Sequence, residues 1–304
     1  MSSPRASAMP AAAAAAALPA EGPGENRRRM ARRREAGLLL LGLPALLLLA
    51  LVFAWPVLRL LSLSVEGGTL EHFEKAALDG LYVSVLLDSL RIAALVTVIC
   101  LLLAYPVAFW LSRAGRLGLA LGMFALLLPF WTSVLVRTYA WMVLLGRNGI
   151  INRMLRDWGW IEAPLPLLHN TTGVLIGMVH VLLPYMVLPI YAALLRVDPD
   201  LSRAAEGLGA PAWRSFLRVT FPLSLPGVSA GCALVFVLSL GFFITPALLG
   251  GGHVIMISML IEQQVREFLE WPFAAALSTV LLLATLAIYA LIGRLTRGAR
   301  HATP

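Results

Sequence analysis

The sequence predicts an all-α membrane protein with six transmembrane helices. Of the 304 residues, 60% are hydrophobic and only 13% are charged, whereas soluble domains carry about 25% charged residues. The hydrophobic residues form six long runs, and a helix of about 20 such residues crosses a bilayer with its backbone hydrogen-bonded internally. A soluble globular protein is therefore excluded. Cys100 and Cys232 both lie inside these runs, which also excludes a disulfide-stabilised secreted fold.

The six predicted spans follow one another through most of the chain. Proline and glycine occur inside several of them, and membrane helices tolerate these residues where neighbouring groups satisfy the freed carbonyls. Aromatic residues such as Trp55, Trp110 and Trp271 lie near several ends, as expected at membrane interfaces. The approximate limits of the spans are residues 36–63, 84–110, 117–145, 173–195, 224–249 and 272–292.

The basic residues predict how the chain is oriented. Of the 24 Lys and Arg residues, 16 lie in the N-terminal segment, between the second and third spans, between the fourth and fifth, and after the sixth. Five lie in the opposite loops, where nine acidic residues outnumber them. The positive-inside rule then places both termini in the cytoplasm. The net charge of +8 therefore reflects membrane topology, and nucleic-acid binding is not expected.

Residues 1–35 have low complexity, with an alanine run over 11–17 and an arginine cluster just before the first span. The charged segment is long, and no small-residue cleavage site follows the apolar run. We therefore expect a disordered cytoplasmic tail over 1–35 instead of a signal peptide. The arginines would anchor the first helix, residues 36–64, at anionic lipid.

No catalytic, metal or cofactor site is predicted. The sequence has no Walker-type phosphate loop, so we do not expect this chain to hydrolyse nucleotide. The histidines lack metal-ligand spacing, and only His180 lies within a span, where a packed and hydrogen-bonded residue is the simpler interpretation. The spans also lack the paired carboxylates that proton-coupled pumps usually require. We expect no enzyme activity and no cofactor.

The loop between the fourth and fifth spans has the features of a compact helical element. It reads RVDPDLSRAAEGLGAPAWRSFLRVTFPLSLP over residues 196–226. Asp198 is a suitable N-cap, Pro199 suits the first helical position, and Gly209 can end the helix in a left-handed conformation. A second amphipathic helix is expected over about 211–219. The residues alone leave two alternatives: a loop packed on its own helices, or a docking element for a cytoplasmic partner.

This loop resembles the cytoplasmic motif of ABC-importer permeases, in which Glu-Ala-Ala is followed by three residues, Gly, nine residues and Ile-x-Leu-Pro. The residues at the motif positions are Arg203, Ala204, Ala205, Gly209, Val219, Phe221 and Pro222. Arg203 reverses the charge of the motif's glutamate, and Glu206, one turn later on the same helix face, is the alternative acid. The resemblance implies that the loop inserts into a partner ATPase and transmits its closure to the spans.

Four further segments resemble the spermidine/putrescine-type permeases, most closely their B subunit. They are LLPFWTSVLVRTYAWMVLL (127–145), GVLIGMVHVLLPYMVLPIY (173–191), GFFITPALLGG (241–251) and EFLEWPFAAALS (267–278). The resemblance covers about residues 37–295. It implies a type I ABC importer permease fold, with a permease core at about 84–295 and the coupling loop at about 196–222.

The same resemblance implies partners, a location and a solute. A second permease subunit, expected to be a different chain, would complete the pathway. Two cytoplasmic ATP-binding subunits and an external solute-binding protein would complete the importer in a bacterial inner membrane. The solute implied is a polyamine. Related permeases carry opines, aminophosphonates and other small solutes, which stay as alternatives. A stand-alone secondary transporter and a membrane anchor without a pathway are rival functions, and neither accounts for the spacing around Gly209.

Six residues are candidates for the translocation pathway: Asp88, Arg91, Arg137, Phe242, Phe243 and Thr245. A charge near the membrane centre costs about 2.5–3.5 kcal/mol, so each ionisable side chain should face the bundle or an interface. Asp88 and Arg137 lie at similar outer-leaflet heights, and a structural pair is one alternative to contact with the solute. For the aromatic residues and the threonine, apolar packing is the alternative to lining or gating the pathway.

The charges favour neither type of solute alone. The acidic outer loops would concentrate cations. Within the spans, Asp88 is the one candidate carboxylate beside two arginines, so a polycation would need acids from the second permease subunit. An anionic solute would instead use Arg91 or Arg137.

Overall fold

The computed structural model describes residues 42–65 and 71–300, and every regular element in these ranges is a helix. The predicted tail, residues 1–35, and the first residues of the predicted first span lie outside them. The chain divides into two compact units, one up to Arg59 and one from Leu60 onward. The apolar helix Gly42–Leu63 contains a π-helical segment, η1 (Ala50–Ala54), followed by α2 (Trp55–Leu63).

The second unit contains all the remaining elements. They are α3 (Glu71–Leu78), α4 (Gly80–Arg113), α5 (Arg116–Leu127), η2 (Leu128–Trp131), α6 (Val134–Leu145), α7 (Ile150–Asp157), α8 (Thr171–Leu194), α9 (Pro199–Gly207), α10 (Ala212–Ser215), η3 (Phe216–Thr220), α11 (Phe221–Leu240), α12 (Ile244–Gly250), α13 (Ile257–Arg266) and α14 (Trp271–Arg300).

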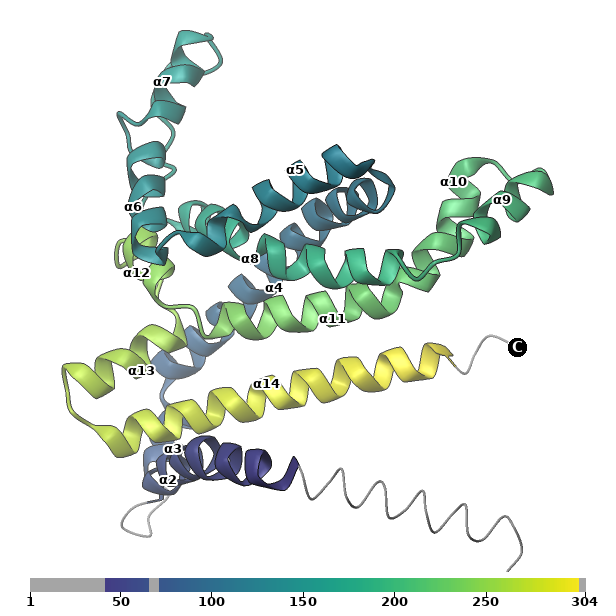
Figure 1. The fold of residues 1–304 in the computed structure, drawn as a ribbon. Coiled ribbons are helices and arrows are strands. Elements are labelled where there is room, and N and C mark those ends of the chain that lie inside the picture. Colours follow the sequence, from purple (N-terminus) through teal and green to yellow (C-terminus); the bar gives the residue numbers. More distant parts are fainter. Residues whose placement is uncertain (1–41, 66–70, 301–304) are drawn as a thin grey trace, which may run out of the picture. The chain divides into compact units, whose positions relative to one another are not determined.

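The centre of this unit is formed by α4, α8 and α11, which pack side by side (Figure 1). Both α4 and α8 present a buried row with a spacing of four residues, the pattern that packs helix ridges into grooves. The row on α4 is Ile92, Val96, Cys100, Ala104 and Ala108, and the row on α8 is Val174, Met178, Leu182, Met186 and Ile190. Cys100, Ala104 and Ala108 in the α4 row are small residues, which allow helices to approach closely, as is typical of membrane proteins.

Gly227 shows how close α11 and α8 lie. A Cβ atom added at this glycine would be 2.5 Å from the backbone oxygen of Pro189 and 2.5 Å from the Cβ of Ala193. Backbone atoms of a packed helix cannot yield by this amount without moving the helix, so α11 and α8 are held at a fixed spacing.

A second buried cluster joins α3, α4, α13 and α14. Its centre is Phe273 of α14, which is fully buried and packs edge-on against Tyr82 with ring centroids 5.0 Å apart. The ammonium of Lys75 lies 4.5 Å from the centroid of the Phe273 ring. The amide of Ile257 donates to the Ser89 hydroxyl at 2.8 Å, which ties the start of α13 to α4.

The prediction of six spans is confirmed if a bent pair of helices counts as one span. In the described residues, five single helices and this bent pair are long and apolar enough to cross a membrane. The second, fourth and sixth predictions correspond to α4, α8 and the segment Trp271–Ala290 of α14. Two helices of the buried core, α4 and α8, begin at N-caps. The Asp79 side chain accepts a hydrogen bond from the Leu81 amide, and the Asn170 side chain accepts one from the Gly173 amide, each at 2.9 Å.

The third span is not the continuous helix that we predicted over 117–145. The segments Arg116–Trp131 and Val134–Asp157 meet at an angle of 103°. Pro129 has no amide hydrogen to continue the helix, and Thr132 closes the last turn by donating its hydroxyl to the Pro129 carbonyl at 3.0 Å. Thr132 and Ser133 then adopt extended or non-helical conformations, which turn the chain into α6.

The fifth span also differs from the prediction of 224–249. It begins earlier, because α10, η3 and α11 form one continuous helix over Ala212–Leu240, and it ends at Leu240. The residues after Gly241 form a separate helix, α12. A continued helix would place the ring of Pro246 against the carbonyl of Phe242, which explains why the chain breaks in this region.

Candidate coupling loop and translocation pathway

The loop between α8 and α11 has the two-helix structure that we predicted. The Asp198 carboxylate caps α9 by accepting from the Asp200 amide at 2.9 Å, and Pro199 occupies the first turn. The helix ends at Gly207, and Gly209 in the turn after it has a φ of +87°, which lies in the left-handed region. The Gly209 and Ala210 amides donate to the carbonyls of Glu206 and Ala205, at 2.9 and 3.1 Å. These bonds satisfy carbonyls at the end of α9 and fix the turn.

The loop is tied firmly to the helices behind it. The hydroxyls of Ser202 and Thr220 lie 3.3 Å apart, which joins α9 to η3. Phe216 of η3 packs edge-on against Phe109 and Tyr105 of α4, with centroids 5.3 and 5.8 Å apart. The hydroxyl of Tyr105 is also hydrogen-bonded to Ser224 of α11 at 2.9 Å. Direct contacts through η3 therefore connect α9 to α4 and α11.

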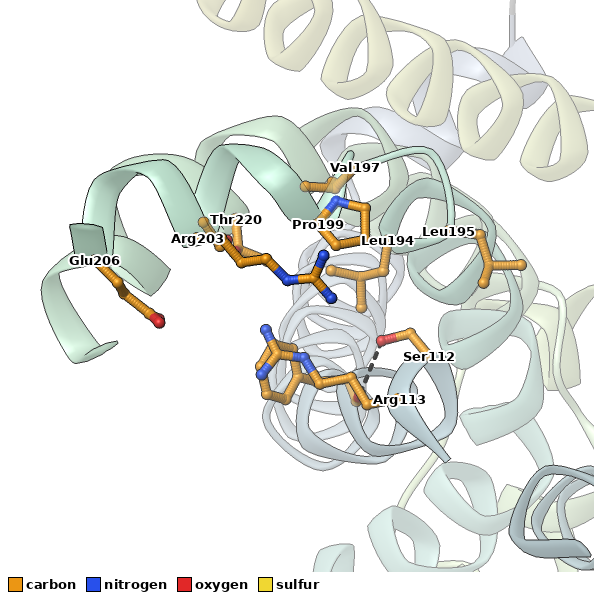
Figure 2. Close-up of a pocket in the computed structure, with 11 residues that line it drawn as sticks. Ser112, Arg113, Leu194, Leu195, Val197, Pro199, Arg203, Glu206 and Thr220 are labelled. Carbon is orange, nitrogen blue, oxygen red and sulfur yellow. Dashed lines mark hydrogen bonds between the residues drawn. The ribbon is translucent and has the colours of Figure 1, made fainter. Parts of the chain in front are cut away.

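Two of the predicted loop residues, Arg203 and Glu206, line a cavity of about 410 Å³ beside α9 (Figure 2). Figure 2 shows Arg203 and Arg113 projecting into this space, while Glu206 lies farther along α9. The Arg113 guanidinium stacks on the Phe109 ring at 4.1 Å. Arg203 pairs with Asp200 at 2.9 Å, and both side chains are 77% exposed. Glu206 is exposed and makes no side-chain hydrogen bond or ion pair with the described residues, so its carboxylate is available to a partner.

The other motif residues occupy the surfaces that a docking element would present. Ala204 is exposed and Ala205 half-buried on α9, and Val219 is half-buried on η3. Pro222 is exposed in the first turn of α11. Pro222 therefore lies inside one continuous helix, not at a boundary between the loop and the span as the sequence indicated.

The structure brings Arg137 and Phe242 together and leaves Asp88 apart from them. Arg137 and Phe242 line a cavity of about 230 Å³ together with Tyr185. Asp88 and Arg91 line a different cavity of about 240 Å³, beside His253. Both side chains are exposed on the surface of α4. No ion pair joins Asp88 to Arg137 within the described residues.

Phe243 lines a third cavity, and its acidic wall was missed by our sequence interpretation. The cavity measures about 430 Å³ and also contains Glu262, Gln263 and Glu267 of α13 and the turn after it. Glu262 pairs with Arg266 at 3.1 Å, and Glu267 accepts from the Gln263 amide at 2.9 Å. In the sequence the two carboxylates counted only as outer-loop acids, because nothing in their spacing indicates that α13 folds back against Phe243.

Thr245 and His180 have structural partners. The Thr245 hydroxyl is buried 3.4 Å from that of Thr138, which joins α12 to α6. The Trp141 indole donates to Nδ1 of His180 at 3.2 Å, and the two rings pack edge-on. Both residues therefore hold helices together. In the part of the chain that the structure describes, no cluster of His, Cys, Asp or Glu could hold a metal ion.

Comparison with known proteins identifies the class. The family model described as "Binding-protein-dependent transport system inner membrane component" matches residues 37–301. The spermidine/putrescine transport system permease protein PotB of Haemophilus influenzae is 39% identical over 224 residues, which is 73% of this chain and 78% of that protein. PotB of Escherichia coli is 38% identical over 213 residues, 70% of this chain and 77% of that protein.

A solved structure supports the fold. The crystal structure of a bacterial alginate ABC transporter, in complex with an alginate pentasaccharide-bound periplasmic protein, contains a chain that matches with a TM-score of 0.70 and 17% identity. The match covers 88% of this chain and 96% of that one.

The apolar helices and this likeness show the type I ABC importer permease fold, in agreement with the family match. The chain belongs to the family of binding-protein-dependent transport system inner membrane components. It is an inner-membrane, multi-pass permease component of an ABC importer, as the sequence resemblance implied.

Gly209→Val should uncouple the permease from its ATPase. No atom lies within 4 Å of an added Cβ, so the effect is conformational: a β-branched residue at a φ of +87° costs about 1–3 kcal/mol in the turn. We expect loss of ATP-driven uptake with normal membrane insertion. The matched control is Gly207→Val, two residues earlier, where φ is not positive and space is also open. Equal uptake by the two variants would contradict the role of the turn.

Proposed function

We propose that this permease imports a small cationic amine such as putrescine or spermidine. The observation that carries the proposal is the identity of 39% and 38%, over most of the chain, to two PotB permeases named for spermidine and putrescine. In this proposal the chain works with a second permease subunit, two cytoplasmic ATP-binding subunits and an external solute-binding protein. The chain itself is not an enzyme, because nucleotide hydrolysis belongs to the ATP-binding subunits.

The cavity beside Phe243 supports a cationic solute. Two carboxylates attract an ammonium group, and the Phe243 side chain, which is 37% exposed, lines the same cavity, where an aromatic ring can bind a cation. Gln263 and Arg266 now supply the donors to these carboxylates. An ammonium group of a diamine can replace the Gln263 amide as donor to Glu267 and would form a charge-assisted hydrogen bond there.

Replacing both Glu262 and Glu267 with Gln should lower putrescine uptake by tenfold or more, since losing even one hydrogen bond to a charged group costs about 1.5–3 kcal/mol, and about 1.4 kcal/mol is a factor of ten. The measurement is the initial uptake of labelled putrescine by the reconstituted importer at saturating loaded binding protein. The same double substitution at Glu71 and Glu74, two exposed acids of α3, is the matched control. An importer that transports an aminophosphonate or an opine but not putrescine would disprove the polyamine assignment.

For the cytoplasmic side, we propose that the α9 turn docks on an ATP-binding subunit and that Glu206 supplies the acid. Arg203 occupies the motif's glutamate position, and its charge is already paired with Asp200. Glu206 projects from the next turn without a partner in the described residues.

Glu206→Lys should reduce the co-purified ATPase by tenfold or more, because in this proposal Glu206 pairs with a basic group of the ATPase, and a like charge placed against that group costs several kcal/mol. Asp157→Lys, the same charge change on exposed α7, is the control. Normal recovery of the ATPase with Glu206→Lys would exclude Glu206 from the contact. Failure of the unchanged permease to recover any ATPase would instead favour a transporter that works alone.

The orientation follows in the same proposal from the bias of Lys and Arg, with both termini and α9 in the cytoplasm. A reporter that is active only outside the inner membrane should be active when fused after Ala77 and inactive when fused after Gly209. Activity at Gly209 would contradict the orientation and the docking of α9 together.

A further inference from the structure

Arg137 lines a cavity that is separate from the coupling loop and from the acidic cavity beside Phe243. The space of about 230 Å³ lies between the bend after η2 and the helices α8 and α11. Phe130, Tyr185 and Phe242 contribute aromatic rings to its wall, and the rings of Phe130 and Tyr185 are 5.1 Å apart. Arg137 is the cationic residue of this lining.

The guanidinium of Arg137 is poorly satisfied. Its Nε atom is buried and has no hydrogen-bond partner among the described residues. Its Nη2 donates to the Thr132 carbonyl at 3.2 Å, which is the other side of the same bend. Arginine has five N–H donors, and a buried donor without an acceptor is unfavourable. The Nε–H of Arg137 therefore needs a hydrogen-bond acceptor that the described residues do not supply.

The charge of Arg137 is also uncompensated. The cavity lining contains no Asp or Glu, and its other polar side chains, Thr132 and Tyr185, are neutral. Asp88, the one carboxylate expected in the spans, lines another cavity. A cation at membrane depth is costly unless it pairs with an anion or faces water. The missing acceptor should therefore carry a negative charge.

A single carboxylate matches the single positive charge of Arg137. A carboxylate carries one negative charge and accepts two parallel N–H bonds from a guanidinium. A phosphate monoester carries about two negative charges at neutral pH and would need a second cation, which this lining lacks. A neutral carbonyl would leave the charge of Arg137 uncompensated.

We propose that the Arg137 cavity is a membrane-embedded binding site for a single carboxylate. The group has two sources: an Asp or Glu side chain of the second permease subunit, or the carboxylate of a transported solute. The site rests on the importer class and not on the polyamine assignment. Because a polyamine has no carboxylate, polyamine transport requires the first source.

Substitutions at Arg137 test the site. In the reconstituted importer with all its subunits, Arg137→Gln should lower uptake of the transported solute by about tenfold or more, since a carboxylate left in the membrane without its cation is strongly unfavourable. Arg137→Lys should retain more uptake than Arg137→Gln, and Arg137→Glu should retain least. The control is Arg153→Gln on α7, an exposed arginine whose Nε donates to the Asn148 carbonyl at 3.1 Å.

This order separates a carboxylate from a purely structural role. A glutamine can still donate to the Thr132 carbonyl, so uptake by Arg137→Gln within twofold of the unchanged importer would overturn the proposal. Loss of ATPase from the purified complex would be a failure of the proposed function, and it is read separately by the amount of ATPase recovered.

Two further measurements identify the source. Arg137→Cys is combined with a cysteine substitution of each Asp or Glu in the membrane spans of the second permease subunit, one at a time. An oxidative cross-link in one of these pairs assigns the carboxylate to that subunit. Labelled 4-aminobutyrate, which differs from putrescine by a carboxylate at one end, tests the solute. Binding of 4-aminobutyrate that is lost in Arg137→Gln assigns the carboxylate to the solute. Absence of both the cross-link and this binding would overturn the proposal.

Discussion

The close packing of α4, α8 and α11 is the constraint on which the rest of this permease depends. Gly227 has no room for a side chain against the backbone of Pro189, so α11 cannot move independently of α8. The same α11 continues without a break from α10 and η3. The α9 turn is therefore joined to the centre of the second unit by this continuous helix and by the aromatic contacts around Phe216.

The ionisable pathway candidates and the acids beside Phe243 lie in three different cavities of this unit. The carboxylates beside Phe243 line a cavity together with exposed polar groups, where a cation can approach them. Arg137 lies instead among aromatic rings with no carboxylate in the described lining. Asp88 and Arg91 occupy a third site on the surface of α4. Charged side chains are costly to expose to lipid, so we expect these three sites to face other subunits, water or solute.

The sequence predicted what depends on composition and local spacing. Six apolar runs, the N-cap Asp198 and the left-handed Gly209 are decided by hydrophobic burial and by backbone geometry close in sequence. The bend at Thr132 and the end of the fifth span at Leu240 were missed, because proline within an apolar run is compatible with either a continuous or a broken helix. The wall formed by Glu262 and Glu267 depends on where α13 folds back, which tertiary packing determines.

The bend at Thr132 changes the surroundings of Arg137, and this bears on which solute the permease can carry. In a straight third span Arg137 would have placed its guanidinium along an ordinary helix surface, and Asp88 at a similar height would have been a reasonable partner. The 103° break gives Arg137 instead the carbonyl of Thr132 and a cavity against α8 and α11, the two helices that are packed most rigidly and one of which continues to the coupling loop. An ion pair formed there with another subunit would couple that subunit to the motion of α11. A cationic solute would then bind at the acidic cavity, and Arg137 would repel it from the space between α6 and α8.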